Sequence, residues 1–173
     1  MTATPAPGRR SGLSPLLVQS LVAAVLATAV AATGGALTQL GPWYRGLIKP
    51  AWQPPDWLFG PAWTLIFICT ACAAVIAWRA ARSPGQRATV LVLMAANAAC
   101  NMGWSLLFFF LQRPDWSLLE VVPLWLSILV PLIVFGRWSR RAGWLLAPYL
   151  AWVSFAAFLN YTIVRLNAPF VGI

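Results

Sequence analysis

The chain contains no histidine, and only three of its 173 residues are acidic. It also lacks a glycine-rich phosphate loop, a carboxylate pair and any cluster of side chains at metal-ligand spacing. These absences argue against hydrolysis by a Ser-His-Asp set, metal catalysis and phosphoryl transfer. They also argue against histidine-ligated haem, whereas a metal-free porphyrin needs no such ligand. We expect no bound metal and no required cofactor.

Charged residues are scarce too, at 9% of the chain against about 25% in soluble domains. Hydrophobic residues make up 61%, which is typical of an integral membrane protein. In a soluble protein the net charge of +9 would suggest nucleic acid, but here the cations lie between apolar runs. We therefore interpret them as topology signals and lipid contacts, and we expect no nucleic-acid partner.

Five apolar runs are each close to the 20 or so residues that a helix needs to cross a hydrocarbon core of about 30 Å. The predicted fold is all-α, an integral membrane bundle of five transmembrane helices within residues 15–173. The expected spans are residues 15–39, 59–79, 87–111, 116–136 and 143–165. Residues 1–14, rich in proline and glycine, are expected to form a disordered tail. The first run exceeds the 7–15 or so residues of a cleaved signal core, so we expect it to be retained.

The cations divide unevenly between the two ends of this bundle. Eight lie in the tail or in the connections after the second and fourth spans: Arg9, Arg10, Arg79, Arg82, Arg87, Arg137, Arg140 and Arg141. Four lie at the other end: Arg45, Lys49, Arg113 and Arg165. The positive-inside rule then places the amino terminus in the cytoplasm and the loop of residues 40–58 outside. We expect a multi-pass protein of a bacterial cell envelope, with inner and outer membranes both left open.

Cys69 and Cys72 form a Cys-x-x-Cys pair, a spacing found in redox and metal sites. The pair lies inside an apolar run, and no histidine is available to complete a metal site. We therefore interpret these thiols, and that of Cys100, as small hydrophobic groups.

The segment from Trp43 to Trp63 is too polar and too rich in proline to cross a membrane. Its four prolines fix φ and remove amide donors, so the loop should be stiff. A stiff, aromatic and cationic loop over a helical bundle predicts a lid on a binding site. The alternative is a belt of tryptophans that anchors the helices at the membrane interface. The candidate lid and rim residues are Trp43, Arg45, Lys49, Trp52 and Trp57.

Residues 87–111 present two helical faces. The polar and aromatic face consists of Asn97, Asn101, Trp104 and Phe108. It should point inward, because an amide that faces lipid is unsatisfied, and its amides either join helices or contact a ligand. The small-residue face consists of Ala95, Ala99 and Gly103. It suits a neighbouring helix or a second protomer.

Residues 143–165 present a face with a large aromatic residue, a gap left by alanine and an amide. It consists of Trp152, Ala156, Leu159 and Asn160. Such a face is typical of one wall of a pocket, and ordinary packing is the alternative. Leu159, Tyr161 and Arg165 also fit a weak pattern proposed for cholesterol.

Glu120 lies one turn inside the span of residues 116–136. An acidic side chain in a membrane can be a functional group. However, Ser117-x-x-Glu120 follows Pro114-Asp115 and matches a capping box, which we expect it to form.

Taken together, these residues resemble the TspO/MBR family, the tryptophan-rich sensory proteins and translocator proteins also called peripheral benzodiazepine receptors. The loop carries Trp43-Tyr44, Leu47-x-Lys49-Pro50-x-Trp52-x-Pro54-Pro55-x-Trp57 and Phe59-Gly60-Pro61-x-Trp63. The spans add Asn101-x-x-Trp104 and Pro148-Tyr149-Leu150-Ala151-Trp152, running into Leu159-Asn160-Tyr161. These motifs cover nearly the whole chain, and together they are highly specific.

The resemblance implies a five-helix bundle, often a homodimer, with a pocket near the lid. In the family this pocket binds porphyrins such as protoporphyrin IX and benzodiazepine-type drugs, and animal members also bind cholesterol. The implied pocket residues are Trp63, Asn101, Trp104, Trp116, Trp152, Ala156 and Leu159, and the helical face described above adds Asn160. Tyr161 and Arg165 correspond to the sterol motif. Gln53 and Asp56 stand where animal members carry histidine in the loop.

We therefore expect a membrane receptor or sensor that binds tetrapyrroles or other apolar ligands, such as sterols or benzodiazepine-type drugs, under the loop. One alternative is a light-dependent porphyrin-degrading enzyme, in which the resemblance implicates Trp63 and Trp152. Another is a transporter of porphyrin or sterol. The expected partners are a small apolar ligand, membrane lipid and a second copy bound through Ala95, Ala99 and Gly103.

Overall fold

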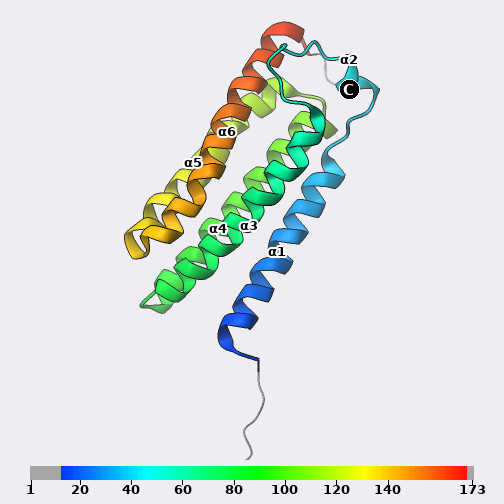
Figure 1. Ribbon diagram of the computed structural model, residues 1–173. Coiled ribbons are helices and arrows are strands. Elements are labelled where there is room, and N and C mark those ends of the chain that lie inside the picture. Colours follow the sequence, from blue (N-terminus) through cyan, green and yellow to red (C-terminus); the bar gives the residue numbers. More distant parts are fainter. Residues whose placement is uncertain (1–12, 171–173) are drawn as a thin grey trace, which may run out of the picture.

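The computed structural model describes residues 13–170, and every regular element in that range is helical. The elements are α1 (Pro15–Leu37), α2 (Pro42–Gly46), α3 (Asp56–Ala80), α4 (Pro84–Ser105), η1 (Leu106–Phe110, a π-helical turn), α5 (Pro114–Trp138) and α6 (Arg140–Asn167). Figure 1 shows the long helices running side by side, with α2 and the loop across one end. Residues 1–12 of the predicted tail lie outside the described residues.

Within residues 13–170, five helices are long and apolar enough to cross a membrane. They are α1, α3, α4 with η1, α5 and α6, and they contain 23 to 28 residues each. The predicted all-α membrane bundle is therefore confirmed, and the chain is a multi-pass membrane protein. The last four of these helices begin two or three residues before the expected spans, whereas α1 begins as expected and ends two residues earlier.

Serine followed by proline begins two of these helices. The Ser14 hydroxyl accepts a hydrogen bond from the Leu17 amide at 3.2 Å, and Pro15 occupies the first helical position. Ser83 and Pro84 repeat the arrangement at the start of α4, where the serine accepts from the Gln86 amide. A serine cap satisfies one of the free amides, and proline lacks the amide that would otherwise be unpaired there.

The long helices differ in how tightly they pack. α6 packs against α5 and α3, and α5 also packs against α4, so these four helices form the body of the bundle. Their buried core includes Ile66, Phe135, Leu146, Tyr149 and Val153. α1 packs mainly against α3 and has no buried residue. It therefore lies at the edge of the bundle (Figure 1).

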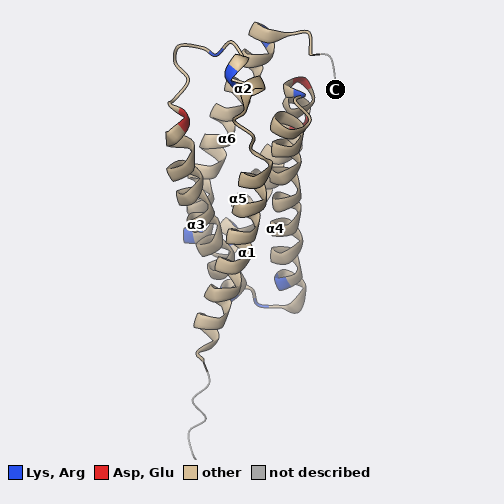
Figure 2. Cartoon of the chain, turned by 90° about the vertical axis from the view of Figure 1, so that its right-hand side faces the viewer, with Lys and Arg blue, Asp and Glu red and all other residues tan. Residues whose placement is uncertain are grey.

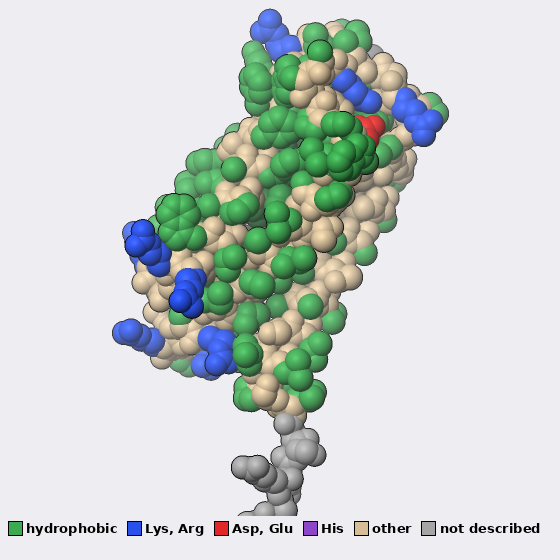
Figure 3. Space-filling view, in the orientation of Figure 1, with side chains coloured by type: hydrophobic (Ala, Val, Ile, Leu, Met, Phe, Trp, Pro, Cys, Tyr) green, Lys and Arg blue, Asp and Glu red, His purple; other side chains and the backbone are tan. Residues whose placement is uncertain are grey.

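The charged side chains gather at the two ends of the bundle. Figure 2 shows lysine and arginine near the loop at one end and at the α3–α4 connection at the other. Figure 3 shows an apolar surface between two groups of cations. This distribution fits a helix bundle whose middle lies in hydrocarbon, because a charged side chain at the bilayer centre is costly.

Gly136 on α5 and Gly143 on α6 bring the two helices into close contact. A Cβ atom added to Gly143 would lie 2.9 Å from the Gly136 Cα atom and 2.9 Å from the Leu132 carbonyl oxygen. A Cβ atom added to Gly136 would lie 3.7 Å from the Gly143 Cα atom, which is an ordinary contact. The contact therefore requires glycine at residue 143 but not at residue 136.

We expect Gly143→Ala to lower the free energy of unfolding in detergent by about 1–3 kcal/mol, because both obstructing atoms belong to the backbone. Gly136→Ala is the matched control. It should leave stability unchanged or raise it by up to about 1 kcal/mol, since alanine favours a helix over glycine. Denaturant titration followed by circular dichroism measures both. Equal effects of the two substitutions would contradict the asymmetry.

Candidate functional site

A cavity of about 870 Å³ lies between α1, α3, α4 and α6, under the loop. Its size is in the range of small-molecule sites, which hold about 300–1,000 Å³. Among the residues predicted for the pocket, five line it: Trp63, Asn101, Trp104, Trp152 and Ala156. They come from three helices, so the bundle brings together side chains that are up to 93 residues apart in the chain.

The three lining tryptophans are held in place by other aromatic rings. The Trp63 ring stacks on Phe67 at 5.5 Å between centroids and forms a T-shaped pair with Tyr149 at 5.8 Å. The Trp152 ring meets Phe59 at 5.6 Å in an edge-to-face arrangement. These separations are in the favourable range for aromatic pairs, so the indoles form fixed walls.

Polar groups are few near the lining tryptophans, and the most important of them is the Asn101 amide. Its Nδ2 atom donates to the Tyr149 hydroxyl at 2.9 Å. Asn97, one turn earlier on α4, donates to Ser127 on α5 at 2.9 Å and does not line the cavity. The sequence left open whether these amides join helices or face a pocket, and the structure distinguishes the two. Asn97 joins helices, while Asn101 both joins α4 to α6 and reaches the cavity.

A π-helical turn follows Trp104 and Ser105 on α4. It changes the helical phase, so Phe109 lines the cavity while Phe108 turns into the core. Phe108 stacks on the Trp104 ring at 5.0 Å. The buried Trp104 Nε1 atom finds no hydrogen-bond acceptor among residues 13–170. Such turns are often found at functional sites.

The loop closes the cavity through a polar network around Tyr44. The Tyr44 hydroxyl donates to the Asp56 carboxylate at 2.8 Å, and both residues line the cavity. The Gln53 amide donates to the same two oxygens at 3.3 Å each. Burial raises the pKa of the Tyr44 phenol, and the bond to Asp56 adds to this shift. Tyr44 therefore stays a neutral donor at physiological pH.

A second set of contacts fastens the loop to the end of α6. The Asn167 side chain donates to the Ile48 carbonyl at 2.9 Å and accepts from the Ile48 amide at 2.8 Å. One side chain thus satisfies both backbone groups of a loop residue. Trp52 adds an apolar contact, because its ring stacks on Phe158 of α6 at 5.1 Å.

The other lid and rim residues lie around this closure. The Trp43 ring meets Phe108 at 6.2 Å, and the Lys49 Nζ atom lies 3.8 Å from the centroid of the Tyr44 ring. Arg45 and Trp57 are exposed, and 71% of Trp57 is accessible. The loop therefore combines a lid, formed by Tyr44 with Lys49, and outward-facing aromatic side chains.

Three residues predicted for the pocket lie elsewhere in the structure. Trp116 is exposed on α5, where the Arg113 guanidinium lies 4.1 Å from its ring. Leu159 is buried in the core beside Tyr44. The Asn160 amide is buried 2.8 Å from the Ser117 hydroxyl and joins α6 to α5. None of the three lines the cavity.

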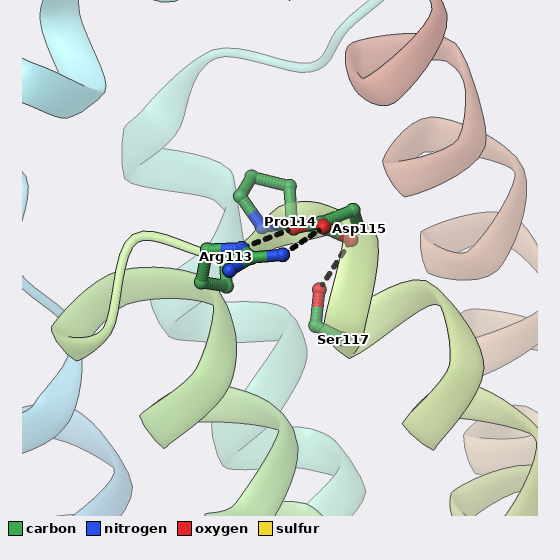
Figure 4. A network of polar contacts seen from close by, with 4 residues as sticks. All are labelled: Arg113, Pro114, Asp115 and Ser117. Atoms are coloured by element: carbon green, nitrogen blue, oxygen red, sulfur yellow. Dashed lines mark hydrogen bonds and ion pairs between the residues drawn. The ribbon is translucent and has the colours of Figure 1, made fainter. Parts of the chain in front are cut away.

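The expected capping box on α5 is not formed. Figure 4 shows that Arg113 pairs with Asp115 and that the Ser117 hydroxyl turns to the Pro114 carbonyl, at 3.0 Å. The helix begins at Pro114, three residues before Ser117, so that serine lies inside the first turn. Glu120 lies next to Gly103 of α4 instead, and its buried Oε2 atom has no hydrogen-bond partner among residues 13–170.

The residues of the sterol motif do not lie together either. Tyr161 and Arg165 are exposed on α6, where the arginine donates to the tyrosine hydroxyl at 3.2 Å. Leu159 faces the core, so the three do not form one surface.

Comparison with known proteins identifies the family of this chain. Residues 21–166 match the TspO/MBR family. The chain belongs to the TspO/MBR family. It is 44% identical to tryptophan-rich protein TspO of Chlorobaculum tepidum over 129 residues, which cover 72% of this chain and 79% of that relative. It is 36% identical to the TspO of Archaeoglobus fulgidus, over 87% of this chain and 99% of that relative. It is 32% identical to the human translocator protein, over 75% and 78%.

In this TspO/MBR protein, α1 supplies a wall of the cavity that the sequence interpretation missed. Ala27, Ala31, Gly34 and Gly35 line it, together with other small residues of the same helix. The signal was present in the sequence, because small residues recur every four positions there.

We expect Asn167→Ala to loosen the lid of this TspO/MBR protein, because it removes both hydrogen bonds to Ile48. A loss of about 1–2 kcal/mol would raise the rate of trypsin cleavage after the exposed Arg45 by about 5- to 30-fold. Gln39→Ala is the control, since this exposed residue makes no side-chain hydrogen bond within residues 13–170. Equal cleavage rates in the two variants would show that Asn167 does not hold the loop.

Proposed function

We propose that this protein is a membrane receptor that binds flat, apolar aromatic ligands, foremost tetrapyrroles such as protoporphyrin IX, beneath the loop. The observation that carries the proposal is the cavity of about 870 Å³ lined by Trp63, Trp104 and Trp152. A large, mostly apolar cavity with a few convergent polar groups is the usual form of a small-molecule site. Indole faces bind flat conjugated rings by stacking, at centroid separations of about 4.5–7 Å.

The polar groups of the cavity suit the edge of such a ring. Asn101 uses its amide nitrogen on Tyr149, and its amide oxygen has no donor among residues 13–170. The Trp104 Nε1 atom has no acceptor among residues 13–170, but it is buried and does not face the open cavity. The site therefore offers one acceptor, the Asn101 amide oxygen, to a ligand within an apolar wall. A ring N–H group of a metal-free tetrapyrrole can donate to this oxygen.

The rim supplies the charge that an acidic tetrapyrrole needs. Lys49 lies against the ring of Tyr44, a residue that lines the cavity. Arg45 is exposed on α2, the short helix that also contains Tyr44. Propionate carboxylates that project toward the loop can pair with these cations. Names of relatives such as "tryptophan-rich sensory protein" and "translocator protein" are consistent with a receptor of this kind.

The test is a titration with protoporphyrin IX, followed by quenching of tryptophan fluorescence in detergent. We expect saturable quenching, and we expect Ala156→Phe to raise the dissociation constant about ten-fold because its ring fills the cavity. Ala151→Phe is the matched control, on an exposed face of the same helix. Trp152→Phe should weaken binding less, while the exposed Trp144→Phe should not. Identical curves for the Ala156 and Ala151 variants would remove the proposed pocket.

We also propose that a second copy of the chain packs on α4 at Ala95 and Ala99, which are exposed. Gly103, the third residue of this face, is partly covered by Glu120 of the same chain. The contact therefore centres on the two alanines, which allow helices to approach closely.

We expect Ala99→Cys, in a chain whose three native cysteines are changed to serine, to form dimers with a short bis-maleimide in membranes. Ala151→Cys on the exposed face of α6 serves as the control and should stay monomeric. Gel electrophoresis measures the dimer fraction. Equal cross-linking at both positions would indicate random collision and contradict the α4 interface.

A further inference from the structure

The end of the bundle opposite the loop carries a positive charge that the acidic side chains of the sequence do not offset. Six exposed arginines lie there, at the ends of α3 to α6 or between them: Arg79, Arg82, Arg87, Arg137, Arg140 and Arg141. Figure 3 shows cationic side chains at this end and, on the face in view, no acidic one among them. The acidic residues of the sequence lie in the first two turns of α3 or α5, at the loop end: Asp56, Asp115 and Glu120.

These acids are too distant to neutralise the arginines. Glu120 is the acid farthest along α5, and Arg137 follows it by 17 residues on the same helix. At 1.5 Å per residue this is about 25 Å, about three times the screening length at physiological ionic strength. Within residues 13–170 the one ion pair joins Arg113 to Asp115, also at the loop end. The negative charge that balances this end must therefore come from outside the chain.

Two of the six arginines have partners in the chain. Arg79 donates to the Gln19 amide oxygen at 3.4 Å, and the Arg87 guanidinium lies 5.6 Å from the centroid of the Trp78 ring. The side chains of the other four make neither a hydrogen bond nor a cation–π contact within residues 13–170. These four are the candidates for binding an anion.

Three of the four lie at the connection between α5 and α6. Arg137 is in the last turn of α5, Arg140 and Arg141 begin α6, and Ser139 alone separates the two helices. The first turn of a helix carries partial positive charge and favours acidic side chains, so two cations there are unfavourable. Local conflicts of this kind are expected at functional sites. The cationic topology signal by itself does not require arginine at these two positions.

We propose that Arg137, Arg140 and Arg141 bind the phosphate of an anionic membrane phospholipid such as phosphatidylglycerol. Guanidinium groups pair with phosphate through parallel charge-assisted hydrogen bonds. The bound anion also offsets the charge at the start of α6. Phosphatidylcholine has the same phosphate, but its choline cation would lie among the same arginines. None of the three residues lines the cavity, so this site is separate from the proposed tetrapyrrole site.

The surface beside the three arginines matches a lipid better than a soluble anion. Trp144 follows Arg141 by three residues and Arg140 by four, so it lies on their face of α6, and 66% of it is accessible. An exposed tryptophan near the end of a membrane-spanning helix is typical of the lipid headgroup level.

The neighbouring helix continues this surface into the hydrocarbon region. Val130 and Ile133 precede Arg137 by seven and four residues, so they lie on its face of α5, and both are exposed. Cationic, aromatic and apolar side chains thus follow one another from the end of the bundle inward. A phospholipid has an anionic head and acyl chains in the same order, whereas free phosphate would use the arginines alone.

The test measures the thermal unfolding midpoint of the full chain in dodecyl maltoside. Dimyristoylphosphatidylglycerol or dimyristoylphosphatidylcholine is added in increasing amounts at constant ionic strength. A ligand that binds the native state raises the midpoint, and the dependence on lipid concentration reports its affinity. We expect phosphatidylglycerol to raise the midpoint until the effect saturates, and phosphatidylcholine to leave it unchanged. Native mass spectrometry of an equimolar mixture should show phosphatidylglycerol retained in preference.

Variants of single arginines locate the site. Arg141→Gln should raise the phosphatidylglycerol concentration for half of the effect about five-fold, and Arg140→Gln/Arg141→Gln about 25-fold. Arg141→Lys keeps the charge and should retain most of the affinity. Arg87→Gln is the matched control, since it removes the same charge at the same end from an arginine that already contacts Trp78. It should change the concentration by no more than about two-fold, because it acts only through the screened field.

Each contrary outcome overturns the proposal. Equal effects of Arg141→Gln and Arg87→Gln would indicate a diffuse field instead of a site. A loss in Arg141→Lys as large as in Arg141→Gln would indicate a packing role for the side chain. Inorganic phosphate that raises the midpoint as much as phosphatidylglycerol, compared with sodium chloride of equal ionic strength, would remove the lipid assignment. The midpoint without lipid shows whether each variant folds, and protoporphyrin IX quenching should be the same in all of them.

Discussion

The Tyr149 hydroxyl is the contact on which the site depends. It accepts a hydrogen bond from Asn101 of α4, and the Tyr149 ring forms a T-shaped pair with Trp63 on α3. The residue itself is almost completely buried on α6. In lipid, polar groups have no water to replace a lost partner, so such a contact fixes three helices relative to one another. The positions of a cavity-lining amide and a cavity-lining indole follow from this one side chain.

α1 takes no part in these contacts around Tyr149, and this explains why a cavity exists. α1 contributes no residue to the buried core and faces the bundle with alanine and glycine. Large side chains there would fill the space between α1 and the tryptophans. Small ones leave it open while the helix remains next to α3. The body of four helices is thus held by a buried core, whereas α1 forms a cavity wall that has no buried residue.

The lengths of the apolar runs were sufficient to predict five spans, because runs of this length have few other structures open to them. Helical spacing predicted that Asn101, Trp152 and Ala156 face a pocket, since each lies on a helical face that was expected to point inward. It could not separate Asn160 from this set. That amide shares the face of Ala156 but finds a buried partner in Ser117 on another helix. Which inward amide meets a ligand depends on tertiary partners that a single helical pattern does not contain.

Access to the cavity follows from the bonds that close each side. The loop is held by the Tyr44–Asp56 hydrogen bond, by both hydrogen bonds between Asn167 and Ile48, and by stacked aromatic rings. The seam between α1 and α3 is held by apolar contacts of small residues and by the Gln19–Arg79 bond. Lipid can replace apolar contacts almost without loss, because it is as apolar as the side chains it displaces. It cannot replace the hydrogen bonds of the loop. An apolar ligand dissolved in the bilayer therefore meets the lower barrier at the seam, and the loop acts mainly to close the cavity toward water.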